Sequence, residues 1–262
     1  MNKNIWRNLA PLMLSVLMLS SFLPKKEKPT LFIIGDSTVK NGRGDGSNGQ
    51  WGWGSVIGSY FKQSRIDVRN KALGGTSSRT FYNNPKLWQQ VLDSIKTGDF
   101  VMIQFGHNDS SPVVDTARAR GTFKGNQDSY EIVDNPLLAQ KEVVYSYGFY
   151  LRRFIKNIQD KGGVAIVCSP IPRDVWDGQK VQSSDYPLWA QQAAEQMGTP
   201  FIPLNRLIIE VYEMEGKNHV GATYFGSVDH THTTLEGARL NARILKEFIK
   251  RNNVAGLGAY LN

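Results

Sequence analysis

Residues 31–38 read LFIIGDST, an apolar run followed at once by glycine, aspartate and serine. A short apolar run that ends at a glycine is typical of a buried β-strand stopping in a tight turn. Ser37 then lies just past the end of the strand, where its hydroxyl can face solvent. A serine in a turn is more often a turn or capping residue than a nucleophile, so this stretch indicates the fold before it indicates any chemistry.

The rest of the chain alternates between strand-like and helix-like segments. Four further strands are predicted, at residues 66–72, 99–105, 164–168 and 200–203. Helices are predicted at residues 55–61, 140–160, 186–197, 204–215 and from 233 onward. Residues 41–54 and 110–138 lack clear periodicity and are expected to be long loops. This alternation predicts an α/β fold with a mainly parallel, five-stranded sheet covered on both faces.

The last helix has the clearest pattern in the sequence. Thr233 followed by Glu236 predicts a capping box at its start. Apolar residues then recur at helical spacing and predict a buried stripe, formed by Leu235, Ala238, Ala242, Leu245 and Ile249.

Three of the predicted strands end in polar or glycine-rich turns, at residues 35–37, 73–77 and 106–109. In an open parallel sheet, ligands bind beyond the carboxyl ends of the strands. We therefore expect these turns to meet on one rim of the sheet and to form the functional site there.

Residues 229–232 read DHTH and offer candidate partners for Ser37. A serine becomes a nucleophile when a base takes its proton, and a third group must hold the tautomer of that base. A turn before the last helix would let Asp229 reach one nitrogen of His232 while the other nitrogen faces a serine. Two alternatives stay open: these residues only cap the helix, or Asp229, His230 and His232 together bind zinc.

Two residues near the other strand ends could stabilise an oxyanion. Asn108, in the run GHND at 106–109, carries a neutral amide that can donate a hydrogen bond to developing negative charge. Gly75 has no Cβ, so its backbone N–H can approach a ligand closely. Asn-Asp and Gly-Gly pairs also end strands commonly, so neither residue decides the chemistry alone.

Taken together, these segments resemble the conserved blocks of the SGNH/GDSL hydrolases. GDST at 35–38, Gly75, GHND at 106–109 and the Asp229/His232 pair occur in the family's order across residues 31 to about 250. The resemblance implies a three-layer, flavodoxin-like fold and a catalytic set of Ser37, His232 and Asp229. It also implies an oxyanion hole built from the backbone amides of Ser37 and Gly75 and the side chain of Asn108.

Within that superfamily, the chain is most similar to rhamnogalacturonan acetylesterases. The similarity rests on GDST at 35–38, QFGHND at 104–109, RARGT at 118–122 and DHTHT at 229–233. It implies a serine esterase that removes acetyl groups from a pectic polysaccharide by a two-step acyl transfer, with no metal or organic cofactor. Alternatives are an esterase for acetylxylan, another carbohydrate or a lipid, a carbohydrate-binding protein without activity, and a metal-dependent hydrolase.

Five further residues are candidates for holding a sugar chain. Trp51, Trp53 and Trp176 have flat faces that suit sugar rings, although a tryptophan in a loop is as often a packing anchor. Arg79 and Arg120 could pair with uronate carboxylates, or could equally be ordinary surface charges.

The N-terminus differs in composition from the rest of the 262-residue chain. Lys3 and Arg7 precede an apolar stretch at residues 10–23, which predicts that residues 1–28 form a secretory signal or an uncleaved anchor. The remaining residues, 29–262, are expected to form one domain that works in the periplasm, at the cell surface or in the medium. Membrane contact is expected only through an uncleaved N-terminal segment.

The charge of the chain is modest once this segment is set aside. Of the formal +8, residues 1–28 contribute +4 from five Lys/Arg and one Glu, which leaves +4 for the domain. No basic cluster is interleaved with aromatic residues, so no nucleic-acid partner is expected. The expected partner is an acetylated polysaccharide. Cys168, the single cysteine, lies in an apolar run and is predicted to be a buried, inert thiol.

Overall fold

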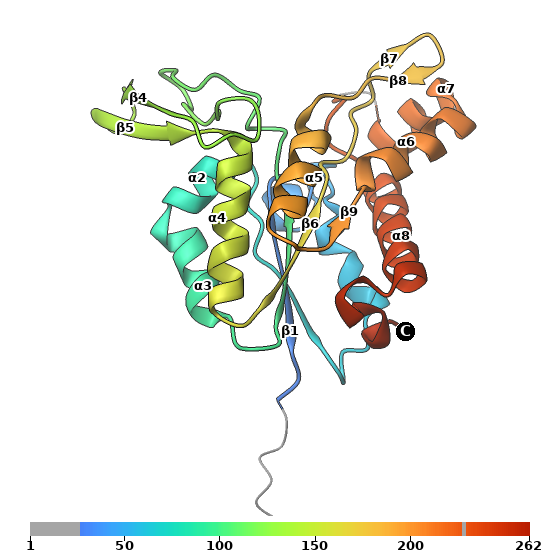
Figure 1. Ribbon diagram of the computed structural model, residues 1–262. Coiled ribbons are helices and arrows are strands. Elements are labelled where there is room, and N and C mark those ends of the chain that lie inside the picture. Colours follow the sequence, from blue (N-terminus) through green and yellow to red (C-terminus); the bar gives the residue numbers. More distant parts are fainter. Residues whose placement is uncertain (1–26, 227–228) are drawn as a thin grey trace, which may run out of the picture.

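The computed structural model describes residues 27–226 and 229–262. The predicted leader, residues 1–28, lies outside this part of the chain except for its last two residues. A twisted central sheet stands between two layers of helices, as Figure 1 shows edge-on. None of the helices described is both long and apolar enough to cross a membrane.

Five parallel strands form the sheet, in the order β2-β1-β3-β6-β9. Their bounds are Thr30–Gly35 (β1), Asp67–Asn70 (β2), Phe100–Gln104 (β3), Val164–Cys168 (β6) and Phe201–Ile202 (β9). Numbered only among themselves, they follow the 2-1-3-4-5 order of flavodoxin-like folds. The predicted α/β class and parallel five-stranded sheet are therefore confirmed, and every strand overlaps its predicted range.

Strand β1 lies inside the sheet and supplies both hydrophobic cores. Successive side chains of a strand point to opposite faces. Leu31 and Ile33 accordingly enter one core, and Phe32 and Ile34 enter the other, all at most 1% exposed. An uninterrupted apolar run is what a strand buried on both faces requires.

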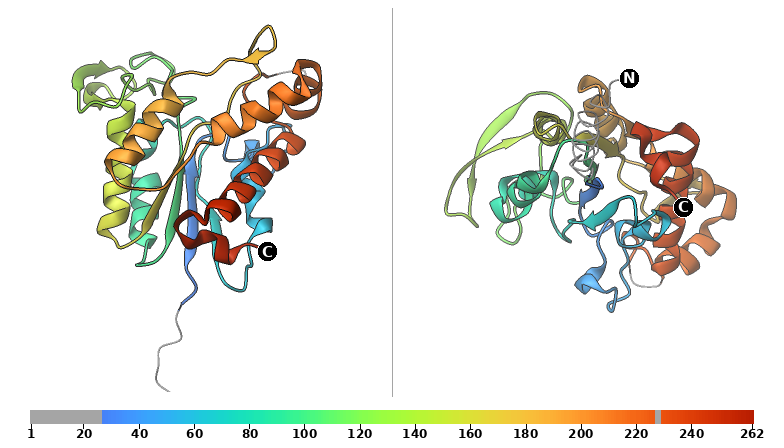
Figure 2. Two further views of the ribbon diagram at one scale, coloured as in Figure 1. Left: turned by 45° about the vertical axis from the view of Figure 1, so that its right-hand side comes forward. Right: turned by 90° about the horizontal axis from the view of Figure 1, so that it is seen from below.

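The helices divide between the two faces, which Figure 2 shows from two further directions. One face is covered by Ser78–Asn83 (α2), Gln90–Ser94 (α3), Tyr147–Asp160 (α4) and Tyr186–Gln196 (α5). The other is covered by Leu204–Glu215 (α6), Lys217–Val220 (α7) and Leu235–Asn252 (α8). Shorter helical turns also pack on that second face, at Trp53–Ser55 (η3), Ile57–Tyr60 (η4) and Val254–Tyr260 (η7).

The predicted helix at 140–160 is correct only in its second part. Ser146 caps α4, since its hydroxyl accepts a hydrogen bond from the backbone N–H of Phe149. The residues before it, Gln140–Tyr145, form strand β5, which pairs antiparallel with β4 (Tyr130–Asn135). Strand β4 lies within the segment predicted to be a loop, and this hairpin was not predicted.

Three other details differ from the sequence-based expectation. The predicted helix at 55–61 is a pair of short 3₁₀ turns, η3 and η4. Helices α2 and α3 were not predicted, since six and five residues are too short for a clear helical period. The capping box at Thr233 is also wrong: the hydroxyl of Thr234 accepts from the Gly237 N–H at 3.2 Å, whereas the Thr233 hydroxyl donates to the Trp51 carbonyl at 2.7 Å.

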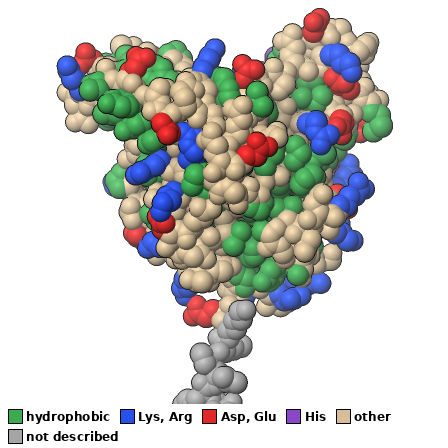
Figure 3. Space-filling view, viewed as in Figure 1, with side chains coloured by type: hydrophobic (Ala, Val, Ile, Leu, Met, Phe, Trp, Pro, Cys, Tyr) green, Lys and Arg blue, Asp and Glu red, His purple; other side chains and the backbone are tan. Residues whose placement is uncertain are grey.

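Two hairpins project from the end of the sheet where β1, β3 and β6 stop. One is β4/β5 and the other is β7 (Trp176–Asp177) paired with β8 (Lys180–Val181). In Figure 1 they lie at the two upper corners, and Figure 3 shows the upper surface hollowed between the lobes that carry them. The candidate site lies at this end of the molecule.

Candidate active site

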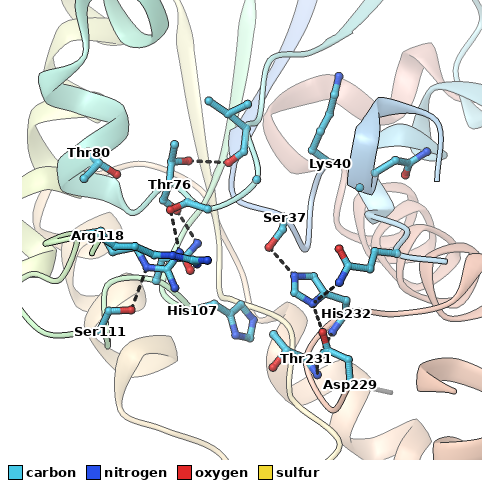
Figure 4. Close-up of a pocket in the computed structure, with 18 of the residues that line it drawn as sticks. Ser37, Lys40, Thr76, Thr80, His107, Ser111, Arg118, Asp229, Thr231 and His232 are labelled. Atoms are coloured by element: carbon cyan, nitrogen blue, oxygen red, sulfur yellow. Dashed lines mark hydrogen bonds and ion pairs between the residues drawn. The ribbon is translucent and has the colours of Figure 1, made fainter. Parts of the chain in front are cut away.

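A cleft of about 1270 Å³ opens beyond the carboxyl ends of the strands. The three turns expected to meet there all contribute to its lining, through Ser37, Gly75 and Asn108. His232 and Asp229 line the same cleft, and Figure 4 shows Ser37 pointing toward His232. The three turns therefore meet on one rim of the sheet, as predicted.

The turn that carries Ser37 is held by its neighbours in the sequence. Gly35 crosses β3 so closely that a Cβ there would lie 2.5 Å from the carbonyl oxygen of Gln104, so a larger residue would displace the strand end. The buried carboxylate of Asp36 accepts hydrogen bonds from the backbone N–H and the hydroxyl of Thr38, at 2.8 and 2.7 Å. These two contacts fold the chain around Ser37 without engaging its hydroxyl.

A second layer of buried hydrogen bonds lies beneath this turn. The indole N–H of Trp53 donates to Oε1 of Gln104 at 2.7 Å, and Nε2 of Gln104 donates to the Thr38 hydroxyl at 2.7 Å. Trp53 and Gln104 are completely buried. Trp53 is therefore the packing anchor given as the alternative, and the sugar-binding prediction for it is wrong.

Ser37, His232 and Asp229 form one chain of hydrogen bonds. Nε2 of His232 lies 2.8 Å from Oγ of Ser37, and Nδ1 of His232 contacts Oδ2 of Asp229. Oδ1 of Asp229 accepts from the backbone N–H of Thr231 at 2.7 Å, which fixes the carboxylate within its own turn. The amide nitrogen of Gln50 lies 3.3 Å from Nδ1 and closes that side of the ring.

The electrostatics of this chain favour an ionised Asp229. Burial by itself raises the pKa of Asp229, but hydrogen bonds from His232 and Thr231 outweigh it and hold the pKa below the usual range of aspartate. An ionised carboxylate at Oδ2 directs the proton of the imidazole to Nδ1. Nε2 then carries the lone pair that faces the serine hydroxyl.

Three potential N–H donors belong to residues that line the cleft with Ser37. The backbone N–H groups of Ser37 and Gly75 donate to no acceptor in the described part of the chain. Gly75 has φ +84°, which favours glycine, and the adjacent Gly74 would place a Cβ 3.5 Å from that of Ser37. Nδ2 of Asn108 donates to the Thr76 carbonyl at 2.8 Å, which orients the amide and leaves its second N–H for a ligand.

Asp109 ties the Asn108 turn to the beginning of α2. It is completely buried and accepts hydrogen bonds from the backbone N–H and the hydroxyl of Ser78. Burial raises the pKa of Asp109 to about 7, although the bonds from Ser78 work in the opposite direction. Asn108 and the Gly75 turn are thus held together through a buried carboxyl group.

The lining of the cleft is strongly cationic. Five basic side chains contribute to it: Lys40, Arg43, Arg118, Arg120 and Arg173. Within residues 27–226 and 229–262, none of them forms an ion pair with a carboxylate. The one acidic residue in the lining, Asp229, is engaged by His232. The cleft therefore offers unpaired positive charge around Ser37.

Of the five residues predicted to hold a sugar, only Arg120 lines the cleft. Its Nη1 donates to the Gly75 carbonyl at 3.1 Å. Arg79 is 1% exposed and paired with Glu142, so its prediction as a surface contact is wrong. Trp51 packs against Gly46 and Trp176 donates to Asp174, and neither lines the cleft.

His107 and Arg173 also line the cleft, although neither was predicted to do so. Nδ1 of His107 accepts from Nε of Arg173 at 3.3 Å, and burial lowers the pKa of His107 against the opposing effect of Asp36. Both residues follow the carboxyl end of a strand, His107 after β3 and Arg173 after β6. The rule that ligands bind at strand ends could have identified them.

The structure does not assemble the zinc site considered as an alternative. His230 turns toward Asp174, with Nδ1 3.5 Å from its carboxylate, while His232 turns toward Ser37. Among the residues that the structure describes, no three His, Cys, Asp or Glu side chains lie close enough together to hold a metal ion.

Two known proteins are similar to this chain over most of its length. The probable rhamnogalacturonan acetylesterase YesY of Bacillus subtilis (strain 168) is 30% identical over 226 residues, 84% of this chain and 92% of that protein. The rhamnogalacturonan acetylesterase of Emericella nidulans is 25% identical over 237 residues, 90% of each chain. The resemblance inferred from the sequence motifs is thereby confirmed.

A solved structure shares the fold. An acetyl-xylooligosaccharide esterase from Geobacillus stearothermophilus matches 84% of this chain and 94% of its own, with a TM-score of 0.57 and 19% identity. At that identity the likeness concerns the fold alone. The sequence of residues 31–245 matches the family described as GDSL-like lipase/acylhydrolase. The chain therefore belongs to this family and is a carboxylic ester hydrolase.

Proposed function

We propose that this esterase removes O-acetyl groups from an acetylated pectic polysaccharide such as rhamnogalacturonan, with Ser37 as its nucleophile. The observation that carries the proposal is the contact between Nε2 of His232 and Oγ of Ser37, at 2.8 Å inside a cationic cleft. Nucleophile and base within hydrogen-bonding distance, with a third group orienting the base, are the signature of nucleophilic catalysis.

The reaction follows from these positions. As Oγ of Ser37 attacks the ester carbonyl, Nε2 of His232 takes its proton, and Asp229 stabilises the imidazolium that forms. The backbone N–H groups of Ser37 and Gly75 and the amide of Asn108 donate to the oxyanion of the tetrahedral intermediate. His232 then returns the proton to the departing sugar hydroxyl, which leaves an acetyl group on Ser37.

Deacylation uses the same groups, with water in the place of the sugar hydroxyl. Water enters the open cleft, and His232 takes one of its protons as the oxygen attacks the acetyl carbonyl. Collapse of the second tetrahedral intermediate releases acetate, and the proton returns to Oγ of Ser37. No residue outside this set is needed to balance the protons.

The unpaired cations favour a pectic substrate over a neutral one. A polymer that contains uronic acids carries a carboxylate on each of these units, and guanidinium groups bind carboxylates through directed, charge-assisted hydrogen bonds. Arg118, Arg120 and Arg173 offer such groups around Ser37. Neutral xylan would leave them unpaired. The names of the two relatives described above point to the same substrate class.

Acetate release tests the proposal. The protein and its Ser37→Ala variant would each be incubated with acetylated rhamnogalacturonan and with acetylated xylan. Release from the pectic polymer by the unmodified protein alone is the expected result. Release from xylan only would keep the mechanism and exclude the substrate. Binding of the polymer with no Ser37-dependent release would indicate a carbohydrate-binding protein with this fold.

The predicted leader completes the proposal. Plant cell-wall polysaccharides are too large to cross a membrane intact, so an enzyme acting on them would have to leave the cytoplasm. Residues 1–28 have the basic start and short apolar core of a secretory signal. We propose that they direct the esterase to the periplasm, the cell surface or the medium.

A further inference from the structure

Arg79 is a buried arginine that takes no part in the proposed reaction. It is the second residue of α2 and only 1% exposed. Its guanidinium reaches four acceptors: Nε donates to Oε1 of Glu142 at 2.9 Å, Nη2 pairs with Oε2 of Glu142, and Nη1 donates to the carbonyls of Val113 and Gly121 at 2.9 and 2.8 Å. A charge buried this deeply persists only when its donors are satisfied.

The acceptors belong to segments that are distant in the sequence. Val113 and Gly121 lie at the two ends of a loop that carries Arg118 and Arg120. Glu142 lies in β5, 63 positions away from Arg79 along the chain. One guanidinium therefore ties helix α2 to both ends of a loop and to a hairpin.

Glu142 binds other residues as well as Arg79. Its carboxylate also accepts hydrogen bonds from Nδ2 of Asn135 at 2.6 Å and of Asn83 at 3.1 Å. Asn135 is the last residue of β4, immediately before the hairpin turn that brings Leu137 into the cleft. The pKa of Glu142 reflects these contacts: burial raises it, but the bonds from Arg79 and Asn135 outweigh burial and lower it.

The tethered segments form one wall of the cleft. Ser111, Arg118, Arg120 and Leu137 all line it, and Figure 4 shows Ser111 and Arg118 across the cleft from His232. The other wall, with His232 and Asp229, comes from the segment before α8 and receives no contact from Arg79. Arg79 therefore anchors the wall that carries Arg118 and Arg120 but not His232 or Asp229, and Gly75 links the two sides, since its carbonyl accepts from Arg120.

We propose that Arg79 is a positioning residue that sets the polymer-binding wall of the cleft, and so determines substrate affinity and specificity without touching the substrate. The inference rests on the proposed function, because it assumes that the cleft holds an acetylated polymer for ester hydrolysis. Displacing the loop would move two guanidinium groups away from the polymer carboxylates.

Two variants test this proposal, together with a matched control. Arg79→Lys keeps the charge but cannot make the forked contact with Glu142 while also reaching two carbonyls. Glu142→Gln removes the charge of the partner and leaves Arg79 in place, which guards against a poorly folded Arg79 variant. Arg152→Lys is the control, because Arg152 is a 13%-exposed arginine that pairs with Asp128 away from the cleft.

For each protein, kcat and KM would be measured on acetylated rhamnogalacturonan and on p-nitrophenyl acetate, alongside the melting temperature. Both test variants are expected to raise the polymer KM by about ten- to a hundredfold, because charge-assisted hydrogen bonds to the polymer are lost. Their kcat/KM on the small ester should change by less than about twofold. The control should leave both substrates unaffected.

Equal losses on both substrates would overturn the proposal, because they would show a general structural role. Full polymer activity in Arg79→Lys would overturn it too, since charge alone would then suffice. Failure of the proposed function has a different signature: the unmodified protein would release no acetate from the polymer in a Ser37-dependent manner. The two ideas are thus separable within one set of measurements.

Discussion

Nε2 of His232 lies 2.8 Å from Oγ of Ser37, although the two residues are 195 positions apart in the chain. Ser37 follows the first strand of the sheet, and His232 precedes the last helix, α8. The contact therefore depends on the whole fold, since the sheet must place β1 beside the segment that leads into α8. It also depends on Asp229, which holds the imidazole from its other side.

Asn108→Ala should slow acyl transfer while leaving substrate binding largely unchanged. The substitution removes one donor to the oxyanion, which costs about 10²–10³ in kcat. Steady-state kinetics on p-nitrophenyl acetate would measure the effect. An unchanged kcat would exclude Asn108 from the oxyanion hole and leave the backbone amides of Ser37 and Gly75 as its donors.

Asp109→Asn should flatten the dependence of stability on pH. The pKa of Asp109 is about 7 in the folded protein against 3.8 for an ordinary aspartate. Because the raised pKa makes the folded state bind more protons, the contribution of Asp109 to stability falls as pH rises from about 4 to about 7, by on the order of 4 kcal/mol at most.

Urea unfolding at several pH values would measure this effect. The asparagine variant should lose less stability than the unmodified protein between pH 4 and 7, while Asp177→Asn, at an exposed position, should behave like the unmodified protein. Parallel stability curves for all three proteins would show that Asp109 is ionised throughout this range.

Trp53→Phe should lower the free energy of unfolding more than the same substitution at a tryptophan without a buried hydrogen-bond partner. Phenylalanine keeps much of the apolar volume but leaves Oε1 of Gln104 buried without its donor. An unsatisfied buried acceptor costs about 1–3 kcal/mol. Trp189→Phe is the control, since Trp189 packs partly buried on the opposite face of the sheet. A larger loss in the control would contradict the support assigned to Trp53.

High salt should selectively weaken binding of the pectic substrate. Charges separated by more than about 3 Å are largely screened at 1 M salt, compared with about 10 Å at 0.1 M. The KM for acetylated rhamnogalacturonan should therefore rise with salt, and Arg118→Gln should reduce the slope. Arg206→Gln, on an exposed part of α6, should leave the slope unchanged. A salt-independent KM would argue against recognition of carboxylates by the cleft.

The sheet was predictable because its strands carry local signals. The run at residues 31–34 is apolar throughout, and Gly35 marks its end, so β1 could be identified without knowing its neighbours. The same holds for β6, whose residues 164–168 are predicted and observed alike. The pairing of Ser37 with His232 could not be computed from local pattern. The residues at 229–232 made His232 a candidate partner and left alternatives open, and the resemblance to a family of known fold selected the pairing among them.

The errors arise where tertiary contacts decide the outcome. Arg79 and Trp53 lie in segments that look like exposed turns, so both were candidates for holding a sugar, with a packing anchor as the alternative for Trp53. Both are buried, because Glu142 and Gln104, distant in the chain, satisfy their donors. Strand β5 was missed because residues 140–145 were assigned to the helix that follows them, whereas they pair with β4.

The central claim is that Ser37 is a nucleophile activated by His232. It is tested most directly by treating the protein with a fluorophosphonate, which reacts with activated serines, and locating the adduct by peptide mass spectrometry. A single adduct at Ser37, formed orders of magnitude more slowly in a folded His232→Ala variant, is the predicted result. Labelling at another serine, or an undiminished rate at Ser37 without His232, would contradict the account.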